Sequence, residues 1–153
     1  MPTFNKIINI LIKKNITVST AESCTGGLLG YTFIKHKGVS KIFDRGLICY
    51  SNISKNKLLK ININLIKKYG AVSNVIAKKM AVNLYKITKS DLSISTTGIA
   101  GPDGNSSKKP IGLVYICIKY KYKIFIYKKN FRGTRIQIQK QTVDFIFQKL
   151  NKL

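Results

Sequence analysis

Side chains able to do chemistry are scarce in this chain of 153 residues, which holds one histidine, three cysteines and five acidic residues. The cysteines and His36 show no paired spacing of the kind that binds zinc, and we expect no metal site. A Ser-His-Asp triad would have to use His36, and no two acidic residues lie within six positions of each other. We therefore expect an enzyme built from this sequence to use neither a histidine base nor a metal, and to need no cofactor.

The segment from Thr20 to Gly27 is the most unusual one, and it lies between a predicted strand and a predicted helix. Two adjacent glycines, Gly26 and Gly27, let the backbone approach a ligand, and the start of a helix offers free N–H groups to an anion. Ser23 could present its hydroxyl to that ligand. In the structural alternative, Ser23 or Thr25 only caps the helix and the glycines permit tight packing. These residues alone leave both interpretations open.

A second glycine-rich segment, from Thr97 to Gly104, directly follows another predicted strand. Its spacing, G-x-x-G-x-x-G, matches neither the dinucleotide-binding fingerprint nor a P-loop. Loops that follow strands in α/β sheets gather where ligands bind. Thr97, Gly98 and Gly101 are therefore candidates for ligand contact, and a long surface turn is the alternative.

A serine nucleophile without a histidine needs another base, and lysine is the recurrent substitute. The pattern Ser-x-x-Lys occurs at Ser54–Lys57 and at Ser106–Lys109. In a chain this rich in serine and lysine, roughly two such pairs arise by chance, so the pattern itself identifies no site.

The elements that must position these segments alternate along the chain. Apolar residues at helical spacing predict helices over 3–14, from about 25, over 53–59, over 73–89 and from 134 to the end, where Thr134 and Gln137 form a capping box. Extended runs predict strands over 16–20, 41–50, 92–96, 111–119 and 123–129, the last two forming a hairpin. This order predicts one domain over residues 1–153, a three-layer α/β/α sandwich with a mixed sheet, a C-terminal β-hairpin and a final helix.

The net charge of +23 raises the question of nucleic-acid binding. The basic residues are 25 lysines and only 3 arginines, and they accompany 24 isoleucines and 12 asparagines. All three abundant residues have AT-rich codons, and the lysines are scattered rather than gathered in a stripe. We attribute the charge to compositional drift and expect no specific nucleic-acid partner, although the positive field should draw anionic small molecules toward a cleft.

Membrane insertion and secretion are also not expected. The longest apolar run, Ile111–Ile118, is far shorter than the roughly 20 residues that a membrane span needs. No secretion leader opens the chain, and three cysteines at irregular spacing fit reduced thiols. These features favour a cytoplasmic protein.

The string Ala21-Glu-Ser-Cys-Thr-Gly-Gly27 resembles the signature of the CinA C-terminal domain family, the nicotinamide-nucleotide amidohydrolases, in their single-domain form. Further matches follow in the family's order over nearly the whole chain. They are Phe43-x-x-Gly46, Tyr50-Ser-Asn52, Lys55, Gly70-Ala-Val-Ser73, Thr97-Gly-Ile-Ala-Gly-Pro102, Lys109-Pro-Ile-Gly112 and Phe131-x-Gly133-x-Arg135.

The resemblance implies hydrolysis of the carboxamide of nicotinamide mononucleotide, giving nicotinate mononucleotide and ammonia within pyridine-nucleotide recycling. By motif, the family's catalytic serine, tyrosine and lysine fall on Ser23, Tyr50 and Lys55. Ser23 would attack the carbonyl, Lys55 would act as the base, and Tyr50 would relay the proton or hold the lysine amine. The resemblance also suggests a homo-oligomer.

Three further expectations concern substrate binding. Backbone N–H groups around Thr25 and Gly26 are candidate donors to an oxyanion or a phosphate. Glu22 would form a charge-assisted hydrogen bond to substrate or to backbone, or be a plain surface carboxylate. Arg135 would contact the ligand phosphate or form a structural salt bridge.

Departures from the family's pattern keep one other function open, and the net charge keeps a second one open. The family usually carries Asp after Gly133 and Arg four residues beyond Arg135, where this chain has Thr134 and Gln139. If Arg135 depends on a neighbouring acid for its orientation, substrate affinity falls. A catalytically silent nucleotide-binding protein is therefore one alternative, and a basic nucleic-acid-associated protein is the other.

Overall fold

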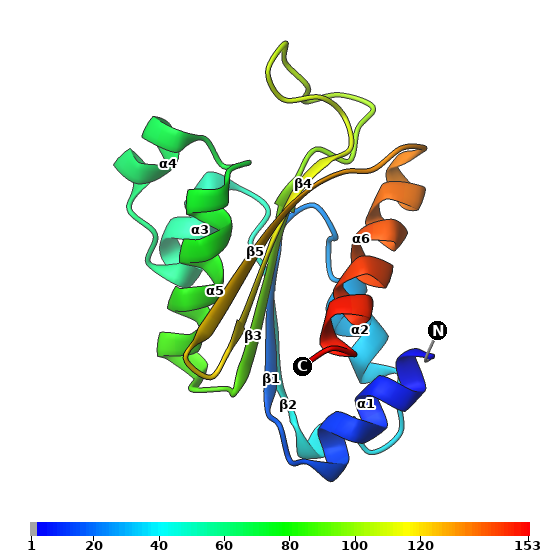
Figure 1. Cartoon of the computed structure of the whole chain (residues 1–153). Coiled ribbons are helices and arrows are strands. Elements are labelled where there is room, and N and C mark those ends of the chain that lie inside the picture. Colours follow the sequence, from blue (N-terminus) through cyan, green and yellow to red (C-terminus); the bar gives the residue numbers. More distant parts are fainter. Residues whose placement is uncertain (1–2) are drawn as a thin grey trace.

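A mixed five-stranded sheet forms the central layer of the computed structural model, which describes residues 3–153 (Figure 1). The strands are β1 Val18–Glu22, β2 Phe43–Ile48, β3 Leu92–Gly98, β4 Leu113–Tyr120 and β5 Lys123–Asn130. Their order in the sheet is β2-β1-β3-β4-β5, with β2, β1 and β3 parallel and β4 and β5 antiparallel to their neighbours. The predicted mixed sheet and C-terminal hairpin are confirmed.

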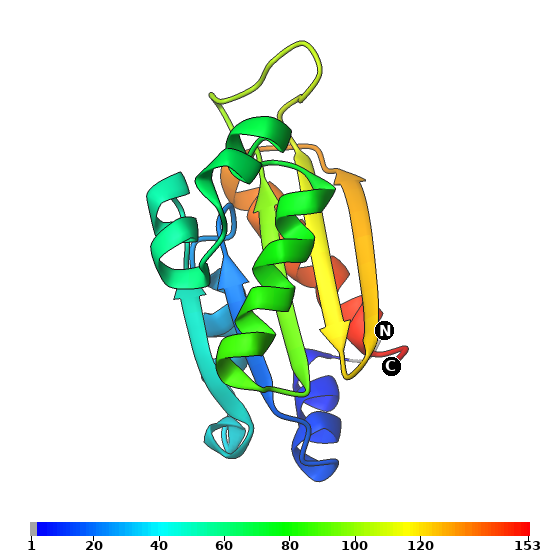
Figure 2. The same cartoon turned by 90° about the vertical axis from the view of Figure 1, so that its left-hand side faces the viewer.

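Helices cover both faces of the sheet, as expected for a three-layer α/β/α sandwich. The helices are α1 Phe4–Lys13, α2 Leu28–Ile34, α3 Asn52–Leu59, α4 Ile63–Tyr69, α5 Asn74–Thr88 and α6 Arg135–Leu150. α1, α2 and α6 lie on one face, and α3, α4 and α5 lie on the other (Figures 1 and 2). No helix within residues 3–153 is long and apolar enough to cross a membrane.

Apolar side chains fill the space on each side of the sheet. Leu29 and Phe33 of α2 meet Phe147 of α6 on one side, and Ile76 and Met80 of α5 are buried on the other. The strands β1 and β3 are buried along almost their whole length because helices cover both of their faces. The segments that follow β1 and β3 thus start from strands that are buried on both faces.

Several bounds of the predicted elements differ from the structure, and two of the differences have a clear physical reason. The helix α4 was not predicted, since its 7 residues bury only Ile66 and show no helical period. The first strand was predicted over residues 16–20, whereas β1 continues to Glu22. A strand buried on both faces need not alternate, so period-two spacing did not mark its end. The capping box of Thr134 and Gln137 is present at the start of α6.

The parallel register brings the chemistry-bearing segments together. Glu22 at the end of β1 lies opposite Ile48 of β2 and Thr96 of β3. The turn after β1, the turn after β2 and the loop after β3 therefore leave the sheet at the same edge, where ligands bind in α/β sheets.

Candidate active site

A pocket of about 230 Å³ lies at this carboxyl edge of the parallel strands. Its lining comes from the segments after β1, β2 and β3, from Ala71 and Val72 before α5, and from the start of α6. The predicted residues among its walls are Ser23, Tyr50, Lys55, Thr97, Gly98, Gly101 and Arg135.

Lys55 is the central basic group of the pocket, and its side chain is only 1% exposed. Its Nζ lies 3.1 Å from Oγ of Ser23 and donates to the carbonyls of Cys49 at 2.8 Å and Tyr50 at 3.1 Å. Helix α3, capped by Ser51, carries Lys55 one turn from its start. A serine hydroxyl and a buried lysine amine are thus held within hydrogen-bond distance of each other.

Burial lowers the pKa of Lys55 below its ordinary value of 10.5, and the smaller effect of the nearby thiols of Cys49 and Cys24 opposes it. Within residues 3–153 no carboxylate forms an ion pair with this amine. A neutral amine has two N–H donors and one lone pair, which match two carbonyls and the hydroxyl of Ser23. The arrangement suits a lysine that takes the serine proton.

Ser23 is 8% exposed and opens the turn between β1 and α2. Its backbone N–H donates to the carbonyl of Thr96 at 3.0 Å, which ties the turn to β3. The adjacent Cys24 is a poor nucleophile, since burial raises the pKa of its thiol to about 12. Ser23 is therefore the better-placed nucleophile of the two.

Glu22 builds the turn and does not line the pocket, so its assignment to substrate binding is corrected. Its carboxylate is 1% exposed and accepts hydrogen bonds from five donors of the turn and of α2. The donors are the hydroxyls of Thr20 at 3.4 Å and Thr25 at 2.6 Å, and the N–H groups of Gly27 at 3.0 Å, Leu29 at 3.0 Å and Gly30 at 2.7 Å. Of the expected alternatives, the bond to backbone is the one observed.

Most N–H groups of this turn already donate hydrogen bonds within the protein, so few of the predicted donors remain free to bind an anion. The N–H of Gly26 donates to the carbonyl of Ser23, and the N–H of Gly27 donates to Glu22. Both glycines have positive φ, 58° and 100°, which explains their presence without a ligand. The side chain of Thr25 bonds Glu22 and Thr96. Among the described residues, the N–H groups of Cys24 and Thr25 have no protein acceptor, so both stay candidate donors.

The loop after β3 forms one wall of the pocket, as its position predicted. The hydroxyl of Thr97 donates to the carbonyl of Ala71 at 2.8 Å, which links this wall to the segment before α5. A Cβ on Gly98 would lie 2.7 Å from the carbonyl oxygen of Leu113, so glycine is required where β3 meets β4. Asp103, which sequence reasoning did not single out, also lines the pocket.

Tyr50 and Arg135 lie together at the outer side of the pocket. Nη2 of Arg135 donates to the hydroxyl of Tyr50 at 2.8 Å, and Nη1 donates to the carbonyl of Gly101 at 2.7 Å. The backbone carbonyl of Tyr50 thus accepts a hydrogen bond from Lys55. The hydroxyl of Tyr50 accepts one from Arg135 and does not contact the lysine amine. Within residues 3–153 Arg135 has no carboxylate partner, so the salt bridge named as one alternative is not observed.

Thr134 and Gln139, the two departures from the family's pattern, both make specific bonds. Thr134 caps α6 through the N–H of Gln137, so a neutral residue serves at this position. Nε2 of Gln139 donates to the carbonyl of Cys24 at 3.0 Å. Sequence reasoning gave Gln139 no contact, although its position one helical turn after Arg135 places both on one face of α6.

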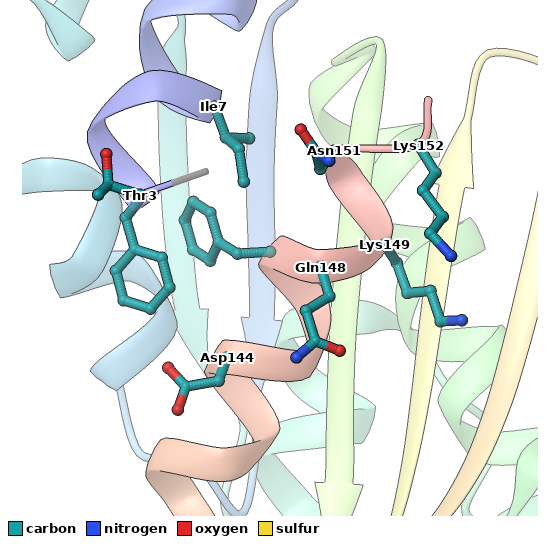
Figure 3. Close-up of a pocket in the computed structure, with 9 residues that line it drawn as sticks. Thr3, Ile7, Asp144, Gln148, Lys149, Asn151 and Lys152 are labelled. Atoms are coloured by element: carbon teal, nitrogen blue, oxygen red, sulfur yellow. The ribbon is translucent and has the colours of Figure 1, made fainter. Parts of the chain in front are cut away.

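A second hollow, of about 690 Å³, lies between α1 and the C-terminal part of α6 (Figure 3). Phe4, Ile7 and Phe147 contribute apolar surface, and Asp144 and Lys149 lie around it. Among the described residues, its lining brings no nucleophile into hydrogen-bond contact with a base. The smaller pocket with Ser23 and Lys55 is therefore the candidate active site.

Comparisons with known proteins agree with the resemblance seen in the sequence. The family model of the CinA C-terminal domain matches residues 2–153. A competence-damage inducible relative from Clostridium novyi (strain NT) is 46% identical over 134 residues, which are 88% of this chain and 32% of that protein. The chain thus spans about a third of the length of the curated relatives it matches.

Solved structures share the fold over almost the entire chain. A competence-damaged protein (CinA) superfamily protein from Klebsiella pneumoniae 700603 superposes with a TM-score of 0.93 at 25% identity, covering 97% of this chain and 93% of that one. The competence/damage inducible protein CihA from Agrobacterium tumefaciens gives a TM-score of 0.91 at 30% identity, covering 99% and 96%.

Proposed function

Because this chain belongs to the CinA C-terminal domain family, we propose that it hydrolyses the carboxamide of nicotinamide mononucleotide to nicotinate mononucleotide and ammonia. The observation that carries the proposal is the distance of 3.1 Å between Nζ of Lys55 and Oγ of Ser23, two residues that are both buried in the pocket wall. A buried serine–lysine pair without an acidic partner is suited to the hydrolysis of an amide.

In the first half of the reaction, neutral Lys55 takes the proton of Ser23 as Oγ attacks the carboxamide carbon. The resulting oxyanion accepts a hydrogen bond from the N–H of Thr25. Protonated Lys55 then gives its proton to the departing nitrogen, the C–N bond breaks and ammonia leaves. Ser23 is left as a nicotinoyl ester.

In the second half, Lys55 takes a proton from a water molecule that attacks the ester carbonyl. The C–O bond to Ser23 breaks, Lys55 returns the proton to Oγ, and nicotinate mononucleotide is released. The carbonyls of Cys49 and Tyr50 keep the amine in place through both halves. The N–H groups of Arg135 not used by Tyr50 and Gly101 are available to the ligand phosphate at the outer side of the pocket.

The test is ammonia release from nicotinamide mononucleotide by the purified protein and by matched pairs of variants. Ser23→Ala should lower kcat by at least about 1,000-fold and keep substrate binding, whereas Ser106→Ala, in an exposed Ser-x-x-Lys pair, should stay near wild type. Lys55→Ala should lower kcat by about 100-fold or more, whereas exposed Lys57 on the same helix should tolerate alanine.

Two outcomes would contradict the proposal. Near-native turnover by Ser23→Ala would exclude the covalent route. A folded wild-type protein that binds the nucleotide without releasing ammonia would instead be a catalytically silent nucleotide-binding protein.

A further inference from the structure

The first two turns of α6 contact three of the segments that line the pocket, those after β1, β2 and β3. Arg135 bonds the carbonyl of Gly101 in the loop after β3 and the hydroxyl of Tyr50 after β2. One turn later, Gln139 bonds the carbonyl of Cys24 in the turn after β1. Residues four apart lie on the same face of a helix, so a single face of α6 holds the turn after β1, the turn after β2 and the loop after β3.

The bond from Gln139 falls on the peptide unit between Cys24 and Thr25. This peptide is trans, and a trans peptide carries its C=O and N–H on opposite sides of one rigid plane. Fixing the carbonyl of Cys24 on Gln139 therefore also fixes the direction of the N–H of Thr25, which points away from Gln139. That N–H has no protein acceptor among residues 3–153.

The other bonds of the turn do not replace this contact. Glu22 holds the side chain of Thr25 and N–H groups of α2, and Thr96 holds the N–H of Ser23 and the hydroxyl of Thr25. None of these bonds involves the Cys24–Thr25 peptide unit. Without Gln139, this unit can rotate while the rest of the turn stays in place.

We propose that Gln139 is a positioning residue, which orients the Cys24–Thr25 peptide so that the N–H of Thr25 faces the oxyanion formed on attack by Ser23. The inference rests on the proposed function for its substrate. It does not require that substrate to be correct, because any reagent that forms a tetrahedral adduct on Ser23 uses the same donor.

The experiment compares Gln139→Met with Gln141→Met. Methionine keeps the length of glutamine and removes the N–H donor. Gln141 is a matched control, since it lies on the same helix and also donates to backbone carbonyls, those of Arg132 and Gln137, away from the pocket. The variants are assayed for ammonia release and for reaction with a serine-directed fluorophosphonate. In the second assay Oγ of Ser23 forms the P–O bond, fluoride leaves, and Lys55 takes the proton.

For Gln139→Met we expect kcat and the rate of phosphonylation to fall together by about 10- to 100-fold, with KM changed less than about twofold. The final yield of adduct at Ser23 should stay complete, which separates a slower site from a partly unfolded protein. Gln141→Met should match wild type in both assays. If Gln139→Met does not fold, Gln139→Glu supplies a second variant of the same shape without a donor, with Gln141→Glu as its control.

Equal rates for the two methionine variants would overturn the inference. Phosphonylation of wild type without ammonia release would refute the proposed function alone, and the comparison of Gln139 with Gln141 would still be decided by phosphonylation. A wild-type protein that resists both reagents would refute both, because Ser23 would then not be an activated nucleophile.

Discussion

Replacing Glu22 by glutamine should destabilise the protein without altering substrate binding. Oε2 of Glu22 accepts three hydrogen bonds. Oε1 accepts two, from the N–H of Gly30 at 2.7 Å and from the hydroxyl of Thr20 at 3.4 Å. The amide NH₂ of glutamine fits best at the Oε1 position, since the hydroxyl of Thr20 can turn and accept. The N–H of Gly30 cannot turn, so it loses its acceptor and meets another donor.

The magnitude follows from this geometry. A buried N–H left without an acceptor costs about 1–3 kcal/mol. The bonds that remain lose the charge of the carboxylate, and charge-assisted bonds are about twice as strong as neutral ones. We expect the free energy of unfolding to fall by about 2–4 kcal/mol and the Tm by roughly 5–15 °C for a domain of this size.

Urea and thermal unfolding of Glu22→Gln measure this change, with Asp44→Asn as the control. Asp44 is an exposed carboxylate paired with Arg45, so its replacement should alter stability by less than about 0.5 kcal/mol. At a temperature where both variants are folded, the KM of Glu22→Gln should stay within about twofold of wild type, because the carboxylate does not line the pocket. A loss of stability no larger than that of Asp44→Asn would refute the role assigned to these five hydrogen bonds.

Three further predictions concern the pocket. Burial lowers the pKa of Lys55, and only the neutral amine can take a proton. The value of kcat/KM should therefore rise with pH to a plateau, with a midpoint below 10.5, and a pH-independent rate would contradict the lysine base. The effects of Tyr50→Phe and Arg135→Met on kcat/KM should be non-additive by at least about 0.5 kcal/mol, since the two residues share one hydrogen bond, and additive effects would argue against that bond. Burial raises the pKa of the Cys24 thiol to about 12, so Ellman's reagent at pH 8 should label the native protein slowly and all three cysteines after unfolding; rapid labelling of Cys24 in the native protein would be inconsistent with its burial.

The fold was largely predictable because most of its elements carry a strong periodic signal. The stripe on α5 and the capping box at Thr134 located two helices, and the closely spaced runs that became β4 and β5 indicated a hairpin. The helix α4 was missed since it buries one residue, and too few apolar positions remain to define a period. Local patterns therefore specified the elements that pack extensively and failed for one that packs little.

The composition of the site was predictable from motifs, whereas the partners of its residues were not. Ser23 and Lys55 are 32 positions apart, and only the parallel pairing of β1 with β2 brings the turns after these strands together. Arg135 and Tyr50 are 85 positions apart, and their hydrogen bond likewise depends on how the fold places the start of α6 beside the turn after β2. Spacing along one element can be inferred from sequence, but a bond between two loops depends on the register of the strands that carry them.

Glu22, beside the pocket, and Lys55, in its wall, show why a basic composition does not prevent this chemistry. Glu22 retains a carboxylate where five donors converge, so its charge is balanced by hydrogen bonds and needs no lysine. Lys55 is bound by carbonyls and a hydroxyl, and among residues 3–153 it has no carboxylate partner that would favour its charged form. An acidic residue introduced beside Lys55 would raise its pKa and disfavour the neutral amine that acts as the base. The scarcity of acidic residues in the pocket is therefore a condition for the proposed mechanism, and the lysines elsewhere on the surface are compatible with it.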